Sequence, residues 1–182
     1  MPTGKRLVGQ RQNDQSNTMK KEETEAAVLN KMAALCSLKE YCVGDIRQKI
    51  ADTGLTDETN ERIIRRLCAD KFIDEERYVR AFIKDKFRFN QWGRVKINYA
   101  LRNKGIQKTL IETELNAIDE SEYNAMLENL IQSKMKSIKG KTPRELFQKL
   151  FRFASGRGFE SWLIIPSLKK ILNTENNEYD LE

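Results

Sequence analysis

The sequence predicts an all-α protein, an elongated array of three tandem three-helix (helix-turn-helix-like) repeats. Three times a helix-like stretch ends in a glycine followed by a large apolar residue, at Gly54, Gly105 and Gly158, and these glycines lie 51 and 53 residues apart. The alternation of apolar and polar residues that is typical of strands is not sustained anywhere. A repeated spacing of this size indicates copies of one supersecondary unit that bury their apolar faces on one another.

The apolar residues around the three glycines repeat in the same register. We expect each glycine to take the left-handed conformation just past a helix end, so that the next, apolar residue folds back onto the helix it has left. Positions four and eight before each glycine, and one and ten after it, are apolar in all three units. They are Ile50, Leu101 and Ala154; Ile46, Ile97 and Leu150; Leu55, Ile106 and Phe159; and Ile64, Leu115 and Leu168.

The first predicted unit covers residues 25–71 and follows a polar, unpatterned arm at 1–24 that we expect to be disordered. Thr56 is the expected N-cap of its third helix, because the acidic residues that follow favour the positive end of a helix dipole. Helical periodicity places the helices of this unit at 25–38, 43–53 and 57–70.

The second and third predicted units cover residues 72–118 and 119–172, and an acidic tail at 173–182 is expected to be mobile. Asp74 is the expected N-cap of the second unit, and Pro143 stands at a helix start, where its missing N–H costs nothing. Pro166 should kink the last helix or end it early. The predicted helices are 75–89, 93–104 and 107–117 in the second unit, and 119–137, 143–155 and 160–172 in the third.

Composition excludes several classes of function. The 182 residues are 33% charged, with a mean hydropathy of −0.68, and no run approaches the roughly 18 apolar residues of a membrane span. The chain contains no histidine and only three cysteines, Cys36, Cys42 and Cys68, without a CxxC pair. We therefore expect free thiols in a reducing cytoplasm, no metal site, no cofactor and no membrane contact.

Basic residues concentrate in the second unit, where residues 77–108 hold ten bases and one acid, Asp85. A solvated basic face is one interpretation, but like charges without partners cost stability. The scarcity of acids therefore favours a polyanion or an acidic protein surface as partner. A second basic stretch runs from Lys134 to Arg157. On a helix that starts at Asp74, one side carries Arg77, Arg80, Lys84 and Arg88, and the core side carries Tyr78, Val79, Phe82 and Phe89.

The next predicted helix, 93–104, adds an aromatic residue among bases. Its buried face should hold Ile97 and Leu101, which leaves Tyr99 projecting outward. An exposed aromatic here suits an interface anchor or a base-stacking platform, although it suits packing on a neighbouring repeat equally well. The candidate partner-binding or DNA-binding residues are Arg77, Arg80, Lys84, Arg88, Arg94, Lys96, Tyr99, Arg102 and Lys104.

Sequence-specific DNA recognition and catalysis both lack the residues they need. A recognition helix should follow the tight turn and present bases or amides, yet the helix after Gly105 carries Glu112 and Glu114, and the helix after Gly54 opens with acids. No GxxxxGK[ST] phosphate loop and no GxSxG elbow is present. Acidic pairs such as Asp119 and Glu120 stand at expected helix starts, where capping explains them. We therefore predict no enzymatic activity.

Two blocks of the second unit carry a family resemblance. Residues 72–83 read FIDEERYVRAFI, and residues 92–106 read WGRVKINYALRNKGI. This combination of an acidic turn, a basic helix, Trp-Gly and Lys-Gly-Ile resembles the RecX family of bacterial recombinase regulators. The resemblance extends over about residues 30–172, with Arg94 standing where that family frequently has proline.

The resemblance implies three tandem three-helix repeats and a non-enzymatic protein that binds the RecA recombinase, above all its filament on single-stranded DNA. It further implies that the protein lies in the helical groove of the filament and limits filament growth, strand exchange and ATP hydrolysis. Direct binding of single- or double-stranded DNA by the basic face is the alternative, and an unrelated helical adaptor is a third. We expect a monomer.

Overall fold

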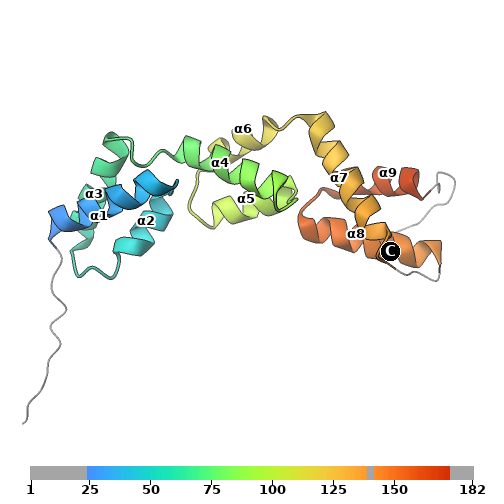
Figure 1. Ribbon diagram of the computed structural model, residues 1–182, viewed down its shortest axis with the longest axis horizontal. Coiled ribbons are helices and arrows are strands. Elements are labelled where there is room, and N and C mark those ends of the chain that lie inside the picture. Colours follow the sequence, from blue (N-terminus) through green and yellow to red (C-terminus); the bar gives the residue numbers. More distant parts are fainter. Residues whose placement is uncertain (1–23, 139–141, 173–182) are drawn as a thin grey trace, which may run out of the picture.

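The computed structural model describes residues 24–138 and 142–172. These residues form nine α-helices and no strand, which confirms the predicted all-α class. The helices gather in three groups of three that follow one another along the long axis of the molecule (Figure 1). Apart from Thr24, the arm predicted at 1–24 lies outside the described residues, as does the tail predicted at 173–182.

Each group of helices corresponds to one repeat of the array. Five of the described helices begin at an N-cap residue whose side-chain oxygen accepts a hydrogen bond from an N–H of the first turn, where the N–H groups have no partner inside their own helix. These N-cap residues are Thr24, Thr56, Asp74, Asp119 and Thr142. Repeat 1 consists of α1 (Glu25–Leu38), α2 (Val43–Ile50) and α3 (Asp57–Ala69); repeat 2 of α4 (Glu75–Arg88), α5 (Arg94–Arg102) and α6 (Lys108–Asn116); and repeat 3 of α7 (Glu120–Met135), α8 (Pro143–Arg157) and α9 (Ser161–Ile171).

The repeated glycines stand in left-handed turns after the second helix of each repeat. Their φ angles are +82° at Gly54, +81° at Gly105 and +90° at Gly158. In the last two turns, the residue after the glycine donates its N–H back to a carbonyl of the helix that has just ended. These bonds run from Ile106 to Leu101 and from Phe159 to Ala154, each over 3.3 Å, and they close the helix end as a Schellman-type cap does.

Helix α9 continues past Pro166 to Ile171, so of the two predicted outcomes, a kink or an early end, the early end does not occur. Proline removes the N–H that would bond the carbonyl four residues earlier, which belongs here to Trp162. Trp162 lies in the first turn of α9, and its side chain is exposed. Because Trp162 is an exposed residue at the helix start, the loss of this bond costs less there than in a buried helix interior.

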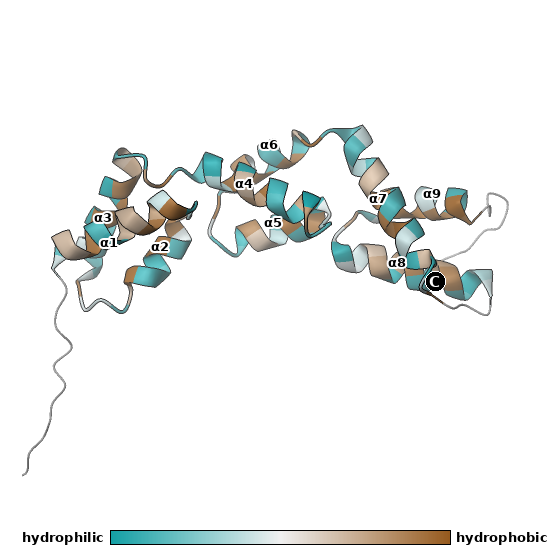
Figure 2. Cartoon of the chain, viewed as in Figure 1, coloured by the Kyte–Doolittle hydropathy of each residue, from teal (hydrophilic) through white to brown (hydrophobic). Residues whose placement is uncertain are grey.

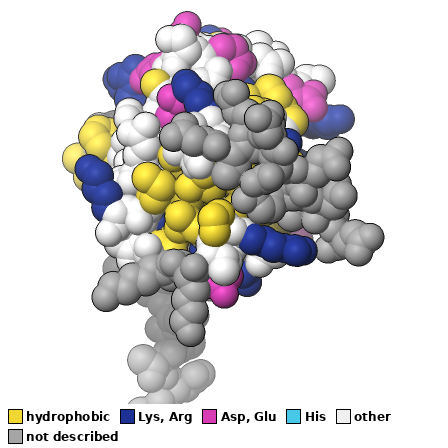
Figure 3. Space-filling model, turned by 90° about the vertical axis from the view of Figure 1, so that its right-hand side faces the viewer, with side chains coloured by type: hydrophobic (Ala, Val, Ile, Leu, Met, Phe, Trp, Pro, Cys, Tyr) yellow, Lys and Arg dark blue, Asp and Glu magenta, His cyan; other side chains and the backbone are white. Residues whose placement is uncertain are grey.

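Two separate apolar cores hold the array together. One core lies within repeat 1, whereas a second continuous core joins repeats 2 and 3 and also takes in Cys42, the N-cap of α2 in repeat 1. All twelve residues of the repeated apolar positions are buried except Leu55, which is half-buried. Most helices carry both hydrophilic and hydrophobic residues (Figure 2), as amphipathic elements of a repeat array must. Apolar side chains also gather in the middle of the end face that repeat 3 presents (Figure 3).

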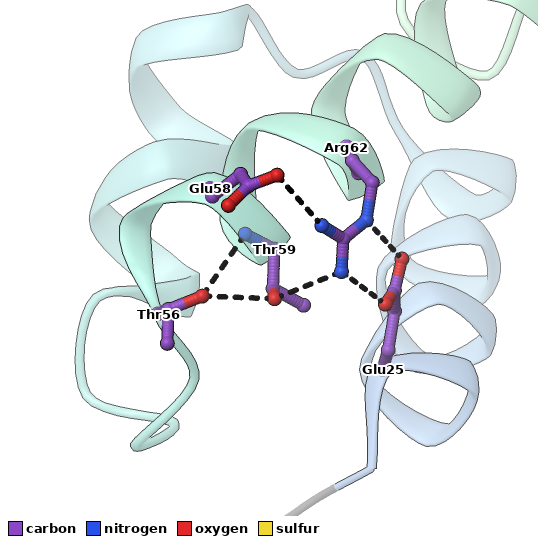
Figure 4. A network of polar contacts seen from close by, with 5 residues as sticks. All are labelled: Glu25, Thr56, Glu58, Thr59 and Arg62. Carbon is purple, nitrogen blue, oxygen red and sulfur yellow. Dashed lines mark hydrogen bonds and ion pairs between the residues drawn. The ribbon is translucent and has the colours of Figure 1, made fainter.

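A polar network ties the outer helices of repeat 1 together (Figure 4). Arg62 of α3 donates through Nη2 to Glu25 of α1 at 2.8 Å and to the hydroxyl of Thr59 at 3.0 Å. Arg62 also pairs with Glu58 at 3.4 Å. The ion pairs of this network are exposed, so solvent and salt screen them and they contribute little to stability. The apolar core of repeat 1 therefore supplies most of its stability.

Repeats 1 and 2 meet through polar contacts and through Cys42, which is buried in the core of repeats 2 and 3. Lys104 Nζ, just after α5, donates to Asp45 Oδ1 of α2 at 2.6 Å. Arg77 Nε of α4 donates to Glu40 Oε1, which precedes α2, at 2.6 Å. The backbones also approach closely, because a Cβ at Gly44 would lie 2.4 Å from the carbonyl oxygen of Lys104. We call this set of contacts the first junction.

Repeats 2 and 3 meet through backbone hydrogen bonds, which we call the second junction. Helix α5 begins at Gly93 without a side-chain cap, so its first N–H groups need partners from elsewhere. Repeat 3 supplies them, and the carbonyl end of α8 meets the N–H end of α5 with opposite partial charges. The bonds run from Gly93 to the Arg157 carbonyl (2.8 Å), from Val95 to the Gly158 carbonyl (3.0 Å), and from Arg94 to the Tyr123 hydroxyl (2.8 Å).

The second junction leaves no room for a side chain at its glycines. A Cβ at Gly93 would lie 2.2 Å from the carbonyl oxygen of Gly158, and a Cβ at Gly158 would lie 2.3 Å from the Cβ of Lys96. Tyr123 is fully buried beneath this contact and donates its hydroxyl to Glu160 at 2.7 Å. Burial and this hydrogen bond raise the pKa of Tyr123 well above its ordinary value.

Candidate functional site

Helix α4 presents a row of exposed bases. Arg77, Arg80, Lys84 and Arg88 are all exposed and stand about one turn apart. Their spacing follows from the helical period, and the Asp74 cap that accepts from the N–H of Arg77 at 3.0 Å fixes where the helix begins. We call these four residues the α4 row.

The opposite side of α4 faces the core, with one departure from the prediction. Tyr78 and Val79 are buried as expected, and Ile83 and Phe87 complete the buried face. Phe89, predicted to lie on the core side, is 79% exposed. Its position explains the difference, because Phe89 is the C-cap of α4 and lies beyond the last turn that packs.

The bases of the α4 row have acidic partners that are distant in the sequence. Arg77 pairs with Glu40, Arg80 with Glu114 of α6 at 3.1 Å, and Arg88 with Glu122 of α7 at 3.2 Å. Arg80 also contacts Glu76 of its own helix. The apparent lack of compensating acids, which favoured a polyanion, thus disappears once the repeats are folded together. Lys84 is the member of the row without an ion pair to any described residue.

A groove of about 420 Å³ runs between the α4 row and the α6–α7 connection. Its floor is apolar and includes Ile83, Phe87 and Ile118. The ion pairs of Arg80 and Arg88 cross from one wall to the other, and Lys84 lies between these two bases on α4. The opposite wall carries three acids, Glu114, Asp119 and Glu122.

Helix α5 presents a second exposed surface beside its buried residues Ile97 and Leu101. Tyr99 is 70% exposed and Val95 is 55% exposed, so of the two predicted alternatives for Tyr99, packing on a neighbouring repeat is not what the structure shows. Arg102 is exposed on the same side and has no ion pair with a described residue. We call Val95, Tyr99 and Arg102 the α5 face.

Three of the predicted site residues lie at the junctions instead. Only 12% of the Arg94 side chain is exposed; its guanidinium lies 4.0 Å from the ring centroid of Tyr123 and pairs with Glu120 at 2.7 Å. Lys96 Nζ donates to the carbonyl of Gly156 at 3.3 Å. Lys104 holds the first junction. These bases connect the repeats, and no pattern of charge in the sequence separates them from the exposed ones.

Repeat 3 carries bases whose positive charge is not balanced in this way. Lys134 Nζ and Arg157 Cζ lie 5.2 and 5.5 Å from the centroid of the Phe153 ring. Arg144 and Arg152 are exposed on α8. None of these four pairs with a carboxylate among the described residues, and the sequence had already marked this stretch as basic.

The described surfaces carry exposed charged and aromatic groups that suit binding. Among the described residues, no group of three histidine, cysteine or acidic side chains is placed to hold a metal ion. Cys36, Cys42 and Cys68 are free, and burial raises the pKa of each thiol, which disfavours the reactive thiolate. None of the described helices has the length and apolarity that crossing a membrane requires.

Comparison with known proteins relates the chain to one family. The family profile described as "RecX, second three-helix domain" matches residues 74–115, and "RecX, third three-helix domain" matches residues 120–165. The first range contains the α4 row and the α5 face. The second contains most of repeat 3.

Two relatives show the extent of the similarity. "Regulatory protein RecX" of Clostridium perfringens (strain 13 / Type A) is 31% identical over 136 residues, which is 74% of this chain and 63% of that protein. "Regulatory protein RecX" of Prosthecochloris aestuarii (strain DSM 271 / SK 413) is 30% identical over 144 residues, which is 79% of this chain and 93% of that protein. The match thus spans less than two thirds of the first relative and nearly all of the second.

Solved structures share the fold. The crystal structure titled "regulatory protein RecX" superposes with a TM-score of 0.72 at 20% identity, covering 83% of this chain and 73% of the other. That of RecX from Lactobacillus salivarius gives a TM-score of 0.71 at 15% identity, covering 81% and 96%. At these identities the likeness concerns the arrangement of helices alone.

Proposed function

Because the chain belongs to the RecX family of regulatory proteins, we propose that it is a non-enzymatic regulator that binds the RecA recombinase. The target is the RecA filament on single-stranded DNA, and the expected effect is inhibition of ATP hydrolysis, filament growth and strand exchange. The protein would act in the cytoplasm, as a monomer, in homologous recombination, DNA repair and the SOS response.

The α5 face is the observation that carries this proposal. It offers an exposed tyrosine and an exposed arginine without an ion pair among the described residues, on a helix that the neighbouring repeat caps. Tyrosine and arginine are the residue types enriched among the energetically dominant contacts of protein interfaces. The elongated array in Figure 1 adds reach, since a long narrow molecule is able to contact successive subunits of a filament.

A titration of ATP hydrolysis tests the proposal. The matching RecA is assembled on single-stranded DNA, and the protein is added from below the stoichiometry of RecA subunits up to it. We expect inhibition well below stoichiometry, because one bound molecule blocks the growth of a filament many subunits long. A gel shift on the same DNA without RecA is the control. An unchanged rate of hydrolysis across the whole titration contradicts the proposal.

Direct binding of DNA is the second candidate, and the surface of repeat 3 favours it. Lys134, Arg144, Arg152 and Arg157 lack carboxylate partners among the described residues, which suits contact with phosphates. If this function dominates, the gel shift without RecA is strong and falls steeply with salt. Replacing Arg144 and Arg152 by glutamine should then lower the salt slope by about one for each phosphate contact that is lost.

A further inference from the structure

The groove beside the α4 row is lined by charges of both signs, and most of these charges have a partner within the protein. Arg80 and Arg88 are held by Glu114 and Glu122 across the groove. On the acidic wall, Asp119 accepts the N–H of Glu122 at 2.8 Å and so serves as the cap of α7. Each of these charges therefore has a partner within the protein.

Lys84 is the exception. It lies on α4 between Arg80 and Arg88, lines the groove, is exposed, and has no ion pair with a described residue. Below it lie the apolar side chains of Ile118, which is half-buried, and the edges of Ile83 and Phe87. The groove thus combines one available cation with an apolar floor.

This combination selects the kind of partner that fits. A nucleic-acid strand would bring a row of phosphates alongside Glu114, Asp119 and Glu122, and like charges brought together in an interface are costly. A protein segment with a single carboxylate meets one unpaired cation and avoids that repulsion. An apolar side chain next to the carboxylate would cover the floor, and it would exclude water from the new ion pair.

We propose that this groove binds a segment of the recombinase that carries one aspartate or glutamate next to a large apolar side chain. Lys84 pairs with the carboxylate, and the apolar side chain packs on Ile118, Ile83 and Phe87. The inference rests on the proposed function for the identity of the partner. The α4 row then contacts protein, and any contact with DNA is made by the bases of repeat 3.

The test measures binding of the full chain, with a fluorophore at its amino terminus, to RecA filaments on single-stranded DNA with a non-hydrolysable ATP analogue. Lys84→Met removes the cation and keeps the apolar stem, and Ala117→Trp fills the groove with its charges untouched. Both should weaken binding at least about tenfold, as loss of a desolvated ion pair does. Lys84→Arg, and Arg65→Met on the exposed outside of α3 as a matched control, should stay within about twofold of the parent protein.

Cross-linking then identifies the occupant. A photo-reactive benzoyl-phenylalanine placed at Ser121, an exposed residue of α7 next to the groove-lining Glu122, leaves the groove open and should form adducts with a recombinase peptide that contains an acidic residue beside an apolar one. Adducts with DNA would overturn the inference. Parent-like binding by both Lys84→Met and Ala117→Trp would also overturn it and leave the proposed function standing. If the parent protein itself fails to bind the filament, the proposed function falls and the inference falls with it.

Discussion

The two junctions between repeats are built from different interactions. The first joins repeat 1 to repeat 2 by the Lys104–Asp45 and Arg77–Glu40 ion pairs and by one buried side chain, that of Cys42. The second joins repeat 2 to repeat 3 by three backbone N–H groups and a continuous apolar core. Ion pairs near the surface contribute little and are screened by salt, whereas buried apolar packing and satisfied backbone groups are costly to lose.

This difference divides the array into a stable pair of repeats and an attached one. Repeats 2 and 3 share their core, so neither keeps its full core if the two separate. Repeat 1 has a core of its own and keeps it when the first junction opens, which withdraws only Cys42 from the core of repeats 2 and 3. We therefore expect motion of the array to concentrate at the first junction, while the α4 row, the groove and the α5 face move as one body with repeat 3.

The largest expected loss of stability comes from a substitution at Gly158, one of the two glycines of the second junction. Gly158→Ala places a Cβ at positive φ, and this Cβ meets the backbone nitrogen of Lys96 at 2.6 Å. Gly105→Ala imposes the same left-handed conformation, but nothing lies within 4 Å of its Cβ. The conformational cost is about 1–2 kcal/mol in both variants, and displacing the neighbouring backbone adds about 1–3 kcal/mol in Gly158→Ala only.

Urea unfolding, monitored by circular dichroism, measures the free energies of unfolding of the two variants and of the parent protein. The difference between the two variants isolates the contact between repeats, because the cost of the turn is common to both variants. Equal losses at Gly158 and Gly105 would show that the close approach of the two repeats in the structure carries no energetic weight. A Gly105→Ala variant as stable as the parent would show that its turn is not constrained.

An intermediate loss of stability is expected when the buried hydroxyl of Tyr123 is removed. Tyr123→Phe removes the acceptor for the Arg94 N–H and the donor to Glu160. Leaving buried polar groups without partners costs about 1–3 kcal/mol. The matched variant Tyr99→Phe, whose ring is 70% exposed, should cost almost nothing. Similar unfolding midpoints for the two variants would contradict the role given to Tyr123.

The fold was predictable because its signal is local. The register of apolar residues around Gly54, Gly105 and Gly158 places the helices, and the cap at Asp74 fixes where α4 begins. The family resemblance drawn from residues 72–83 and 92–106 is confirmed by the profiles and relatives. Helix spacing alone was enough to place the α4 row on the exposed side and Ile97 in the core.

The candidate site was less predictable because its charges are balanced over long distances. Glu114 and Glu122 lie 34 residues from their partners Arg80 and Arg88. Nothing in the sequence around either glutamate indicates a partner on another helix. Arg94 counted as one more exposed base, yet it packs on Tyr123 within the second junction. Its position after Trp-Gly, at a helix start without a polar cap, was the one signal of that role.

The smallest expected effect is the opening of the first junction in acid. Burial by itself raises the pKa of the Asp45 carboxyl, but hydrogen bonds, above all that from Lys104, outweigh it and lower the pKa below its usual value of 3.8. A carboxylate with a lowered pKa stabilises the folded contact above its usual pKa, and this contribution disappears as the pH falls through the lowered value. Because the pair is partly exposed, the contribution should not exceed about 1 kcal/mol.

Energy transfer between dyes on repeat 1 and repeat 3 detects this opening. Lowering the pH from about 6 to about 3 should broaden the distance distribution, while the helical circular dichroism of each repeat persists. Asp45→Asn should give the broad distribution already at neutral pH, and its distribution should change less on acidification, because the carboxylate whose protonation opens the junction is gone. A distance distribution that is narrow and the same for parent and variant at every pH would mean that the Lys104–Asp45 pair does not hold the junction. Repeat 1 would then be fixed to repeat 2 by the close approach of Gly44 to the Lys104 carbonyl, and Gly44→Ala would be the change that releases it.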